Sequence, residues 1–160
     1  MNLQILAIGR LKGECERRMV EDYLARARPF LRAMGLSGIG VREFAESRAA
    51  SAAQRKAQEA ATLRKAAGKG AILLALDEGG ELPSSREFSI RLKKLAMSGA
   101  PGLAILIGGP DGLDADLLKQ SRLTISLGRM TWPHRLARIL IAEQLYRAAT
   151  IHAGHPYHRD

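Results

Sequence analysis

Short apolar runs that end in a glycine or a charged residue constrain the fold of this chain more than any other feature. Three of them are expected to be strands: NLQILAIG at Asn2–Gly9, AILLAL at Ala71–Leu76 and LAILI at Leu103–Ile107. They do not show the strict apolar–polar alternation of a strand with one face in water. Strands that are apolar throughout are typical of parallel sheets buried on both faces. Two further strands are expected at Gly38–Phe44 and Leu123–Leu127.

Segments with helical patterning separate these runs. The expected helices cover Leu11–Met34, Ala49–Ala67, Ser84 or Ser85 to Met97, Leu113–Gln120 and Pro133–Thr150. Pro29 is expected to interrupt the first of them, and Glu87 is placed as in a capping box at the start of the third. The alternation of strands and helices predicts an α/β fold with a largely parallel sheet and helices on both faces. No repeat or linker divides the chain, so residues 1–160 are expected to form a single domain.

The net charge of +9 is distributed unevenly along the chain. Residues 1–70 carry 14 basic and 7 acidic side chains, and residues 121–160 carry 6 and 2, whereas the middle of the chain is slightly acidic. A basic protein of this kind is suited to polyanions, because binding releases their condensed counterions. A basic surface that is only solvated is the alternative. Only 4% of the residues are aromatic, which argues against an open platform for stacking bases.

The composition also excludes several classes of protein. An apolar share of 46% is enough for a core and argues against a disordered chain. Cys15 is the single cysteine, which excludes an internal disulfide and favours a reduced, cytoplasmic location. No apolar run reaches the roughly 18 residues that would span a bilayer, so no membrane association is expected. Residues 1–10 lack the features of a signal peptide.

Three loops follow expected strands, at Asp77–Pro83, Gly108–Gly112 and Gly128–Pro133. Ligands of open parallel sheets bind beyond the carboxyl ends of the strands, so these loops form the candidate site. The GGPDG loop permits close backbone approach, and a Cβ at Gly108 is expected to collide with a ligand or to strain the backbone. It matches neither the dinucleotide nor the P-loop motif, and an ordinary tight turn is an equally good interpretation.

The carboxyl-terminal segment gathers all four histidines: His134, His152, His155 and His158. They lack the spacing of a known metal motif, so no metal is expected. The last six residues, HPYHRD, concentrate groups that move protons or bind anions. His158 is a candidate base, Arg159 a candidate stabiliser of negative charge, and Tyr157 a candidate for positioning a nucleobase. A solvated, fraying tail is the alternative.

Apolar residues cover most of the circumference of the expected helix Pro133–Thr150. Such a helix is buried on more than one side. In a chain of this size one of those sides is expected to be a subunit interface, which predicts a homodimer.

Four segments resemble the RlmH family, small methyltransferases of the SPOUT superfamily that act on large-subunit ribosomal RNA. They are LDEGG at Leu76–Gly80, LIGGPDG at Leu106–Gly112, SLGRMTWPHRLARILIAEQLYRA at Ser126–Ala148, and HPYHRD at His155–Asp160. The opening NLQILAIGRLK is also similar, so the resemblance covers the whole chain. It is highly specific from Leu103 onward and least diagnostic over Arg32–Ala67.

The resemblance implies a carboxyl-terminal trefoil knot, a homodimer and S-adenosylmethionine (SAM) as cofactor. By position, the family's cofactor contacts fall on Leu76, Gly108, Leu127, Gly128, Arg129, Met130, Thr131 and Trp132. The GRMTW stretch departs from other members of the family, so its side chains carry less weight than its backbone. The implied activity is methylation of N3 of a pseudouridine in 23S ribosomal RNA (rRNA) within the ribosome, near the decoding region.

Two other functions remain open at the level of sequence. A non-catalytic RNA-binding or ribosome-associated protein would account for the charge, but not for three converging glycine-containing loops. A nucleotide hydrolase is disfavoured because the phosphate-binding loop is missing. Stabilisation of the native protein by SAM distinguishes the enzyme from the binding protein.

Overall fold

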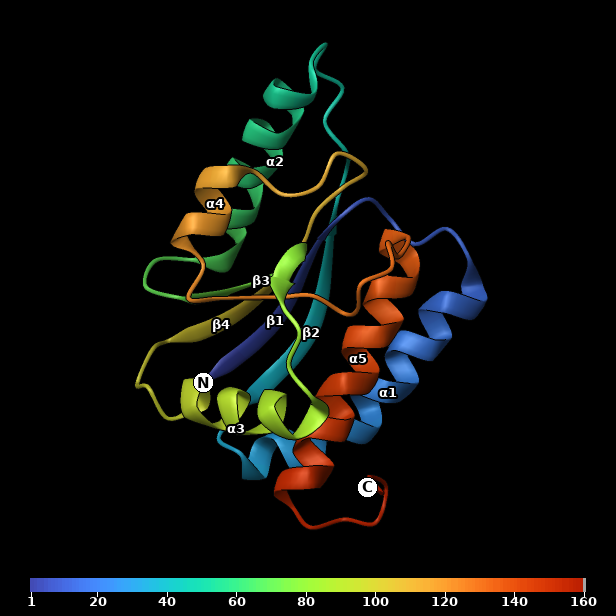
Figure 1. The fold of residues 1–160 in the computed structure, drawn as a ribbon, viewed down its shortest axis with the longest axis vertical. Coiled ribbons are helices and arrows are strands. Elements are labelled where there is room, and N and C mark those ends of the chain that lie inside the picture. Colours follow the sequence, from blue (N-terminus) through green and yellow to red (C-terminus); the bar gives the residue numbers. More distant parts are fainter. Residues whose placement is uncertain (160) are drawn as a thin grey trace.

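All five strands of the sheet run parallel, in the order β2-β1-β4-β3-β5. Figure 1 shows this computed structural model, which describes residues 1–159. The strands are β1 (Asn2–Ile8), β2 (Ser37–Phe44), β3 (Ile72–Glu81), β4 (Gly102–Ile107) and β5 (Leu123–Ile125). Because the strands are parallel, the loops that follow them emerge at one edge of the sheet.

Helices cover both faces of the sheet, as expected from the sequence (Figure 1). They are α1 (Glu14–Ala33), α2 (Ala52–Ala67), α3 (Ser85–Ala96), α4 (Ala115–Gln120) and α5 (His134–His152). The α1, α3 and α5 helices pack together on one face, while α2 and α4 share the apolar cluster on the other. None of the helices within residues 1–159 is long and apolar enough to cross a membrane.

Alternate residues of the central strands enter different cores. In β1, Leu3 and Ile5 pack in the cluster beneath α1 and α5, whereas Leu6 and Ile8 pack in the cluster beneath α2. All four side chains are fully buried. The strand therefore needs apolar residues at consecutive positions, which is the reason for the continuous runs in the sequence.

Two local expectations about α1 and α3 have different outcomes. The capping box is confirmed: the Ser84 hydroxyl accepts from the Glu87 amide at 3.2 Å, and the Glu87 carboxylate accepts from the Ser84 amide at 2.7 Å. The predicted interruption at Pro29 is wrong, since α1 continues to Ala33. Leu31 lies beyond the proline and is buried in the core, so packing holds the last turn in place.

The prediction of a loop over Asp77–Pro83 is wrong for its first five residues. β3 continues to Glu81, and both Leu76 and Glu81 pair with Ile125 of β5 across an irregularity in the ladder. Gly80 makes this possible, because a Cβ there would lie only 2.6 Å from the carbonyl carbon of Ile125. The Ser126 amide then donates to the Glu81 carbonyl at 2.7 Å.

A buried arginine ties α5 to the edge of the sheet. The Arg138 side chain is fully buried and donates to the carbonyls of Ile8 and Gly9, each at 2.8 Å, and to Glu43 at 2.6 Å. Burial lowers the pKa of Arg138, while Glu43 acts in the opposite direction. A buried guanidinium that holds two strand-end carbonyls fixes where α5 begins relative to β1.

We expect Arg138→Met to lower the free energy of unfolding by about 3 kcal/mol, because Glu43 and two carbonyls lose their partner. Arg135→Met is the matched control, since Arg135 pairs with Glu16 at the surface and 56% of its side chain is exposed. The control should lose less than about 1 kcal/mol. Urea unfolding of both variants measures the difference, and equal losses would contradict a locking role for Arg138.

Candidate active site

A pocket of about 840 Å³ opens at the carboxyl ends of β4 and β5, beside Leu76, Asp77 and Glu78 of β3. All three loops singled out from the sequence contribute to its wall, together with the start of α5 and residues of α2 and α4. Six of the eight predicted cofactor residues line it: Leu76, Gly108, Leu127, Met130, Thr131 and Trp132. Gly128 and Arg129 belong to the same loop but do not line the pocket, and Gly128 faces a smaller neighbouring groove.

The GGPDG segment is both a tight turn and a wall of the pocket. The Gly112 amide donates to the Gly109 carbonyl at 3.0 Å, with Pro110 and Asp111 at the two central positions. Gly112 has φ +81°, a conformation that favours glycine. The tight turn is confirmed, and the ligand site at the same residues stays a prediction.

Gly108 is tightly enclosed by its own chain. A Cβ there would lie 2.8 Å from the carbonyl carbon of Gly112 and 3.0 Å from the amide of Leu113. A side chain at Gly108 would therefore collide with the turn itself, which is the backbone strain expected from the sequence, and a collision with a ligand stays a prediction. A glycine at this position lets the end of β4 pack against the GGPDG turn.

Arg55 of α2 holds the turn from outside. Its guanidinium pairs with Asp111 through Nε–Oδ2 at 2.6 Å and Nη2–Oδ1 at 3.0 Å, and it also donates to the Ala49 carbonyl at 3.1 Å. The hydrogen bond from Arg55 lowers the pKa of Asp111, so the pair stays charged at neutral pH. The sequence reasoning missed this residue because the pattern over Ala49–Ala67 predicts a helix but not what that helix packs against.

The loop after β5 is held by a hydrogen bond between two of its own residues. The Ser126 hydroxyl donates to the Gly128 carbonyl at 2.7 Å, and Gly128 has φ +144°. Beyond this turn, Met130 and Trp132 are large apolar side chains that remain 73% and 41% exposed. The loop therefore brings apolar surface to the rim of the pocket.

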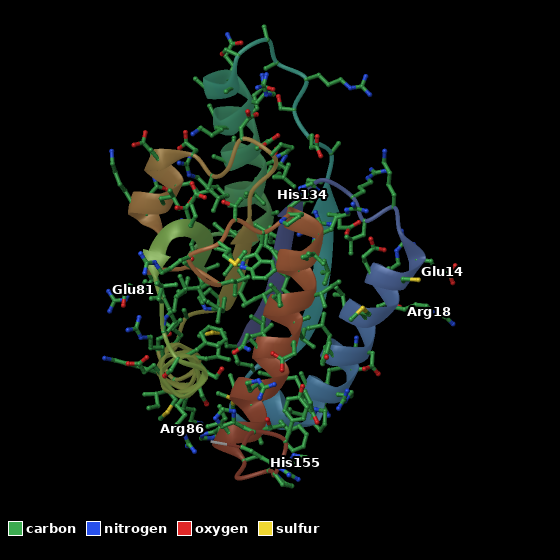
Figure 2. All side chains as sticks on the ribbon, turned by 45° about the vertical axis from the view of Figure 1, so that its right-hand side comes forward. Glu14, Arg18, Glu81, Arg86, His134 and His155 are labelled. Atoms are coloured by element: carbon green, nitrogen blue, oxygen red, sulfur yellow. The ribbon has the colours of Figure 1, made fainter. Side chains whose placement is uncertain are left out.

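His134 stands where α5 meets the pocket (Figure 2). Partial burial lowers the pKa of its imidazole, and the nearby charge of Arg138 lowers it further. The ring is therefore neutral at pH 7. It was grouped with the tail histidines in the sequence, but the fold places it at the opposite end of α5.

The carboxyl-terminal tail does not reach the pocket of its own chain. Figure 2 shows His134 at one end of α5 and His155 beyond the other. The helix has 19 residues, which corresponds to about 28 Å. The structure therefore brings six of the predicted cofactor residues together and keeps Tyr157, His158 and Arg159 apart from them.

Tyr157 anchors the tail on α5 and α1. Its ring lies 4.4 Å from that of Tyr146, and its hydroxyl donates to Glu143 at 2.9 Å. Burial, followed by the bond to Glu143, raises the pKa of Tyr157 to about 12. The guanidinium carbon of Arg26 lies 4.7 Å from the centre of the Tyr146 ring and adds a cation–π contact. Tyr157 is thus a protonated anchor that holds this part of the tail against α5.

His158 is in contact with an arginine. Nη1 of Arg147 lies 3.3 Å from Nδ1 of His158, while Arg147 is itself held by Glu143. Because a guanidinium only donates, Nδ1 is the acceptor in this contact. Glu143 and Arg147 were absent from the candidates drawn from the sequence, where they look like ordinary helix residues.

Within residues 1–159, no three His, Cys, Asp or Glu side chains come together in a way that could hold a metal ion. His155 makes an edge contact with the Phe30 ring at 5.2 Å, and its Nδ1 accepts from the Tyr157 amide at 3.2 Å. Its contacts are those of a packed side chain.

The pocket suits a nucleoside cofactor of the size of SAM. Its volume lies within the range of about 300 to 1,000 Å³ that is usual for small-molecule sites. Apolar side chains such as Leu76 and Leu118 share its wall with the turn 108–112, where an added Cβ at Gly108 has no room. Leu76, Gly108, Leu127, Met130, Thr131 and Trp132 would hold the cofactor.

We expect Gly108→Ala to lower the melting temperature, because overlap with Gly112 and Leu113 costs about 1 to 3 kcal/mol. Gly108→Ala should also abolish the stabilisation of the protein by added SAM. Gly40→Ala is the control, since its Cβ would meet nothing nearer than the Gly38 carbonyl at 3.9 Å. Thermal unfolding with and without SAM measures both effects, and a Gly108→Ala protein that behaves as the wild type would contradict the close packing.

Comparison with known proteins gives the family. The model described as "Predicted SPOUT methyltransferase" matches residues 1–158. The chain is 51% identical to the ribosomal RNA large subunit methyltransferase H of Methylocella silvestris and 47% identical to that of Brucella anthropi. Both alignments cover 100% of each chain.

Among solved structures, a probable methylase family protein from Haemophilus influenzae Rd KW20 has a similar fold. The TM-score is 0.53 at 14% identity, and the alignment covers 99% of this chain and 70% of that one. The matched model and the two close relatives show that the chain belongs to the SPOUT methyltransferases, in the family of the ribosomal RNA large subunit methyltransferase H.

Proposed function

We propose that this methyltransferase transfers a methyl group from SAM to N3 of a pseudouridine in 23S rRNA, within the ribosome. The observation that carries the proposal is the pocket where three strand-end loops meet, in a chain whose relatives are named for methylation of large-subunit rRNA. The excess of basic side chains suits an RNA substrate.

When bound, SAM supplies a methyl group on a positively charged sulfur. The chain has to hold the acceptor nitrogen in line with that methyl group and keep both groups in place. The 108–112 turn and the 126–132 loop are fixed by their own hydrogen bonds, so they are suited to form a rigid cofactor site. The acceptor nitrogen also loses a proton, and its negative charge needs a partner.

The trefoil knot belongs to the same proposal. The segment that joins α4 to α5 connects helices on opposite faces of the sheet. On its way it passes against the end of β3, where Gly80 leaves room for Ile125 and the Glu81 carbonyl accepts from Ser126. A chain that crosses from one layer to the other beneath the β3–α3 connection is what such a knot requires.

The homodimer is supported by apolar surface beside the pocket. Leu136 on α5 is 43% exposed, and a groove of about 260 Å³ next to it is lined largely by apolar residues such as Leu82 and Leu140. Two α5 helices packed antiparallel across a twofold axis would cover this surface. The same arrangement would carry the tail of each subunit to the pocket of the other.

The tail residues take their proposed roles in that setting. Tyr157 fixes the tail, and His158 donates a hydrogen bond from Nε2 to the nucleobase as negative charge develops. Arg159, which is exposed, binds a backbone phosphate or the same charge. This assignment replaces the base role considered from the sequence with a donor role, because Arg147 faces Nδ1.

Residues 1–160 form a single SPOUT domain in this proposal, supported by one continuous sheet that extends from β2 to β5. Asp160 lies outside the described residues. The proposed working location is the cytoplasm, with no metal and no membrane partner.

The assay that tests the function uses SAM with a labelled methyl group. Purified protein is incubated with naked 23S rRNA, isolated subunits or 70S ribosomes, and the labelled base is mapped. We expect one labelled pseudouridine, carrying its methyl group at N3, with assembled ribosomes as the best substrate. SAM binding without methylation of any of these RNAs would contradict the proposed substrate.

The shared site is tested by mixing two inactive variants. One lacks residues 155–160, and the other is Leu118→Trp, which fills the pocket from α4, on the face away from α5. Random reassociation should restore about a quarter of the wild-type activity, because half of the dimers then contain one complete site. Absence of recovery between two dimeric variants would show that the tail does not serve the partner.

The role of His158 is tested by comparing Ala and Gln at that position. The Gln amide keeps a donor, so His158→Gln should retain most of the single-turnover rate, while His158→Ala should lose about ten-fold or more. Equal losses of rate in His158→Ala and His158→Gln, together with loss of the acidic limb of the pH–rate profile, would instead show that His158 is the base.

A further inference from the structure

Asp111 lines the pocket but is paired with Arg55, and the other Lys, Asp and Glu side chains that line it are segregated between its walls. Lys56 lines the wall on the α2 side, and its charge, after the hydrogen bond from Arg55, helps to lower the pKa of Asp111 in the 108–112 turn. Asp77 and Glu78 line the wall at the end of β3, where the Thr131 hydroxyl donates to Glu78 at 3.5 Å. The cation therefore lies beside the 108–112 turn, and the two carboxylates lie beside the 126–132 loop.

These three charges have no ion-pair partner among residues 1–159. Asp77 accepts from the Gly79 amide at 2.9 Å, and Glu78 accepts from Thr131, so each carboxylate is oriented by a neutral donor. Lys56 is half-buried and lacks a hydrogen-bond partner in the same part of the chain. By contrast, Arg55, next to Lys56, is fully engaged with Asp111 and the Ala49 carbonyl.

We propose that this charge polarity orients the cofactor, with Lys56 taking the carboxylate of its methionine part and Asp77 and Glu78 facing its sulfonium. The inference rests on the proposed use of SAM and adds to it. SAM carries a negative carboxylate and a positive sulfur at separate positions, so it matches a pocket with separated charges. The opposite orientation would bring like charges together.

The same polarity distinguishes cofactor from product. During transfer the methyl carbon bonds to the acceptor nitrogen, the electron pair of the carbon–sulfur bond stays on sulfur, and the proton of the nitrogen passes to solvent water. The product S-adenosylhomocysteine is therefore neutral at sulfur and loses the attraction to Asp77 and Glu78. Product binding is weakened without any change in shape, which favours its release.

The test is calorimetry of three adenosine ligands with the full chain. SAM has both the amino-acid end and the charged sulfur, S-adenosylhomocysteine has only the amino-acid end, and 5′-methylthioadenosine has neither. Lys56→Met should weaken the first two about five-fold and leave the third unchanged. Asp77→Asn and Glu78→Gln should weaken SAM about five-fold and S-adenosylhomocysteine less than two-fold.

Matched controls lie on the same elements. Lys65→Met removes a charge from α2 away from the pocket, and Glu81→Gln removes one from β3, where Glu81 pairs with Arg91 instead. Neither should change the affinity for any of the three ligands. The Asn and Gln changes keep the acceptors used by Gly79 and Thr131, so the local fold is preserved.

Equal weakening of all three ligands by Lys56→Met would overturn the inference, as would equal weakening of SAM and S-adenosylhomocysteine by the carboxylate variants. In both cases the wild-type protein would still bind SAM, so the proposed cofactor would not be contradicted. If the wild-type protein bound none of the three ligands, the proposed use of SAM would fail, and the orientation with it.

Discussion

The close passage of Ile125 over Gly80 is the constraint on which the rest of the site depends. It lets β5 pair with the far end of β3, which directs the following loop back toward the GGPDG turn. Without it the 126–132 segment would leave the sheet edge, and the pocket would lose one of its three walls. A single absent Cβ thus decides where the chain goes after its last strand.

The α5 helix sets the second condition. Arg138 fixes its first turns against the ends of β1 and β2, so its start belongs to the pocket. Its far end carries the tail, held by Glu143 and Arg147 and by stacked aromatic rings. A rigid helix of about 28 Å between the two groups of residues explains why one copy of the chain does not bring them together.

Much of this architecture could be predicted from the sequence because its causes are local. Continuous apolar runs revealed strands buried on both faces, and Ser84 with Glu87 revealed the start of α3. The extension of β3 to Glu81 depends on a long-range pairing with Ile125, which local patterns do not contain. Residues of all three segments line one pocket, since parallel strands end at one edge.

The parts of the site that the sequence missed come from tertiary contacts. Arg55 and Lys56 look like surface residues of an alanine-rich helix until α2 is placed beside the GGPDG turn. The tail residues were recognised by type, but their distance from the pocket depends on the length and direction of α5. Spacing in the sequence carries no information about that distance.

Amide hydrogen exchange with and without SAM tests the central claim most directly, namely that the three strand-end loops hold the cofactor. Binding should slow exchange in the 108–112 turn and the 126–132 loop, and at the end of β3 near Leu76. The outer surface of α1 should exchange as before. Protection confined to other segments, or none at SAM concentrations that saturate binding, would contradict the account.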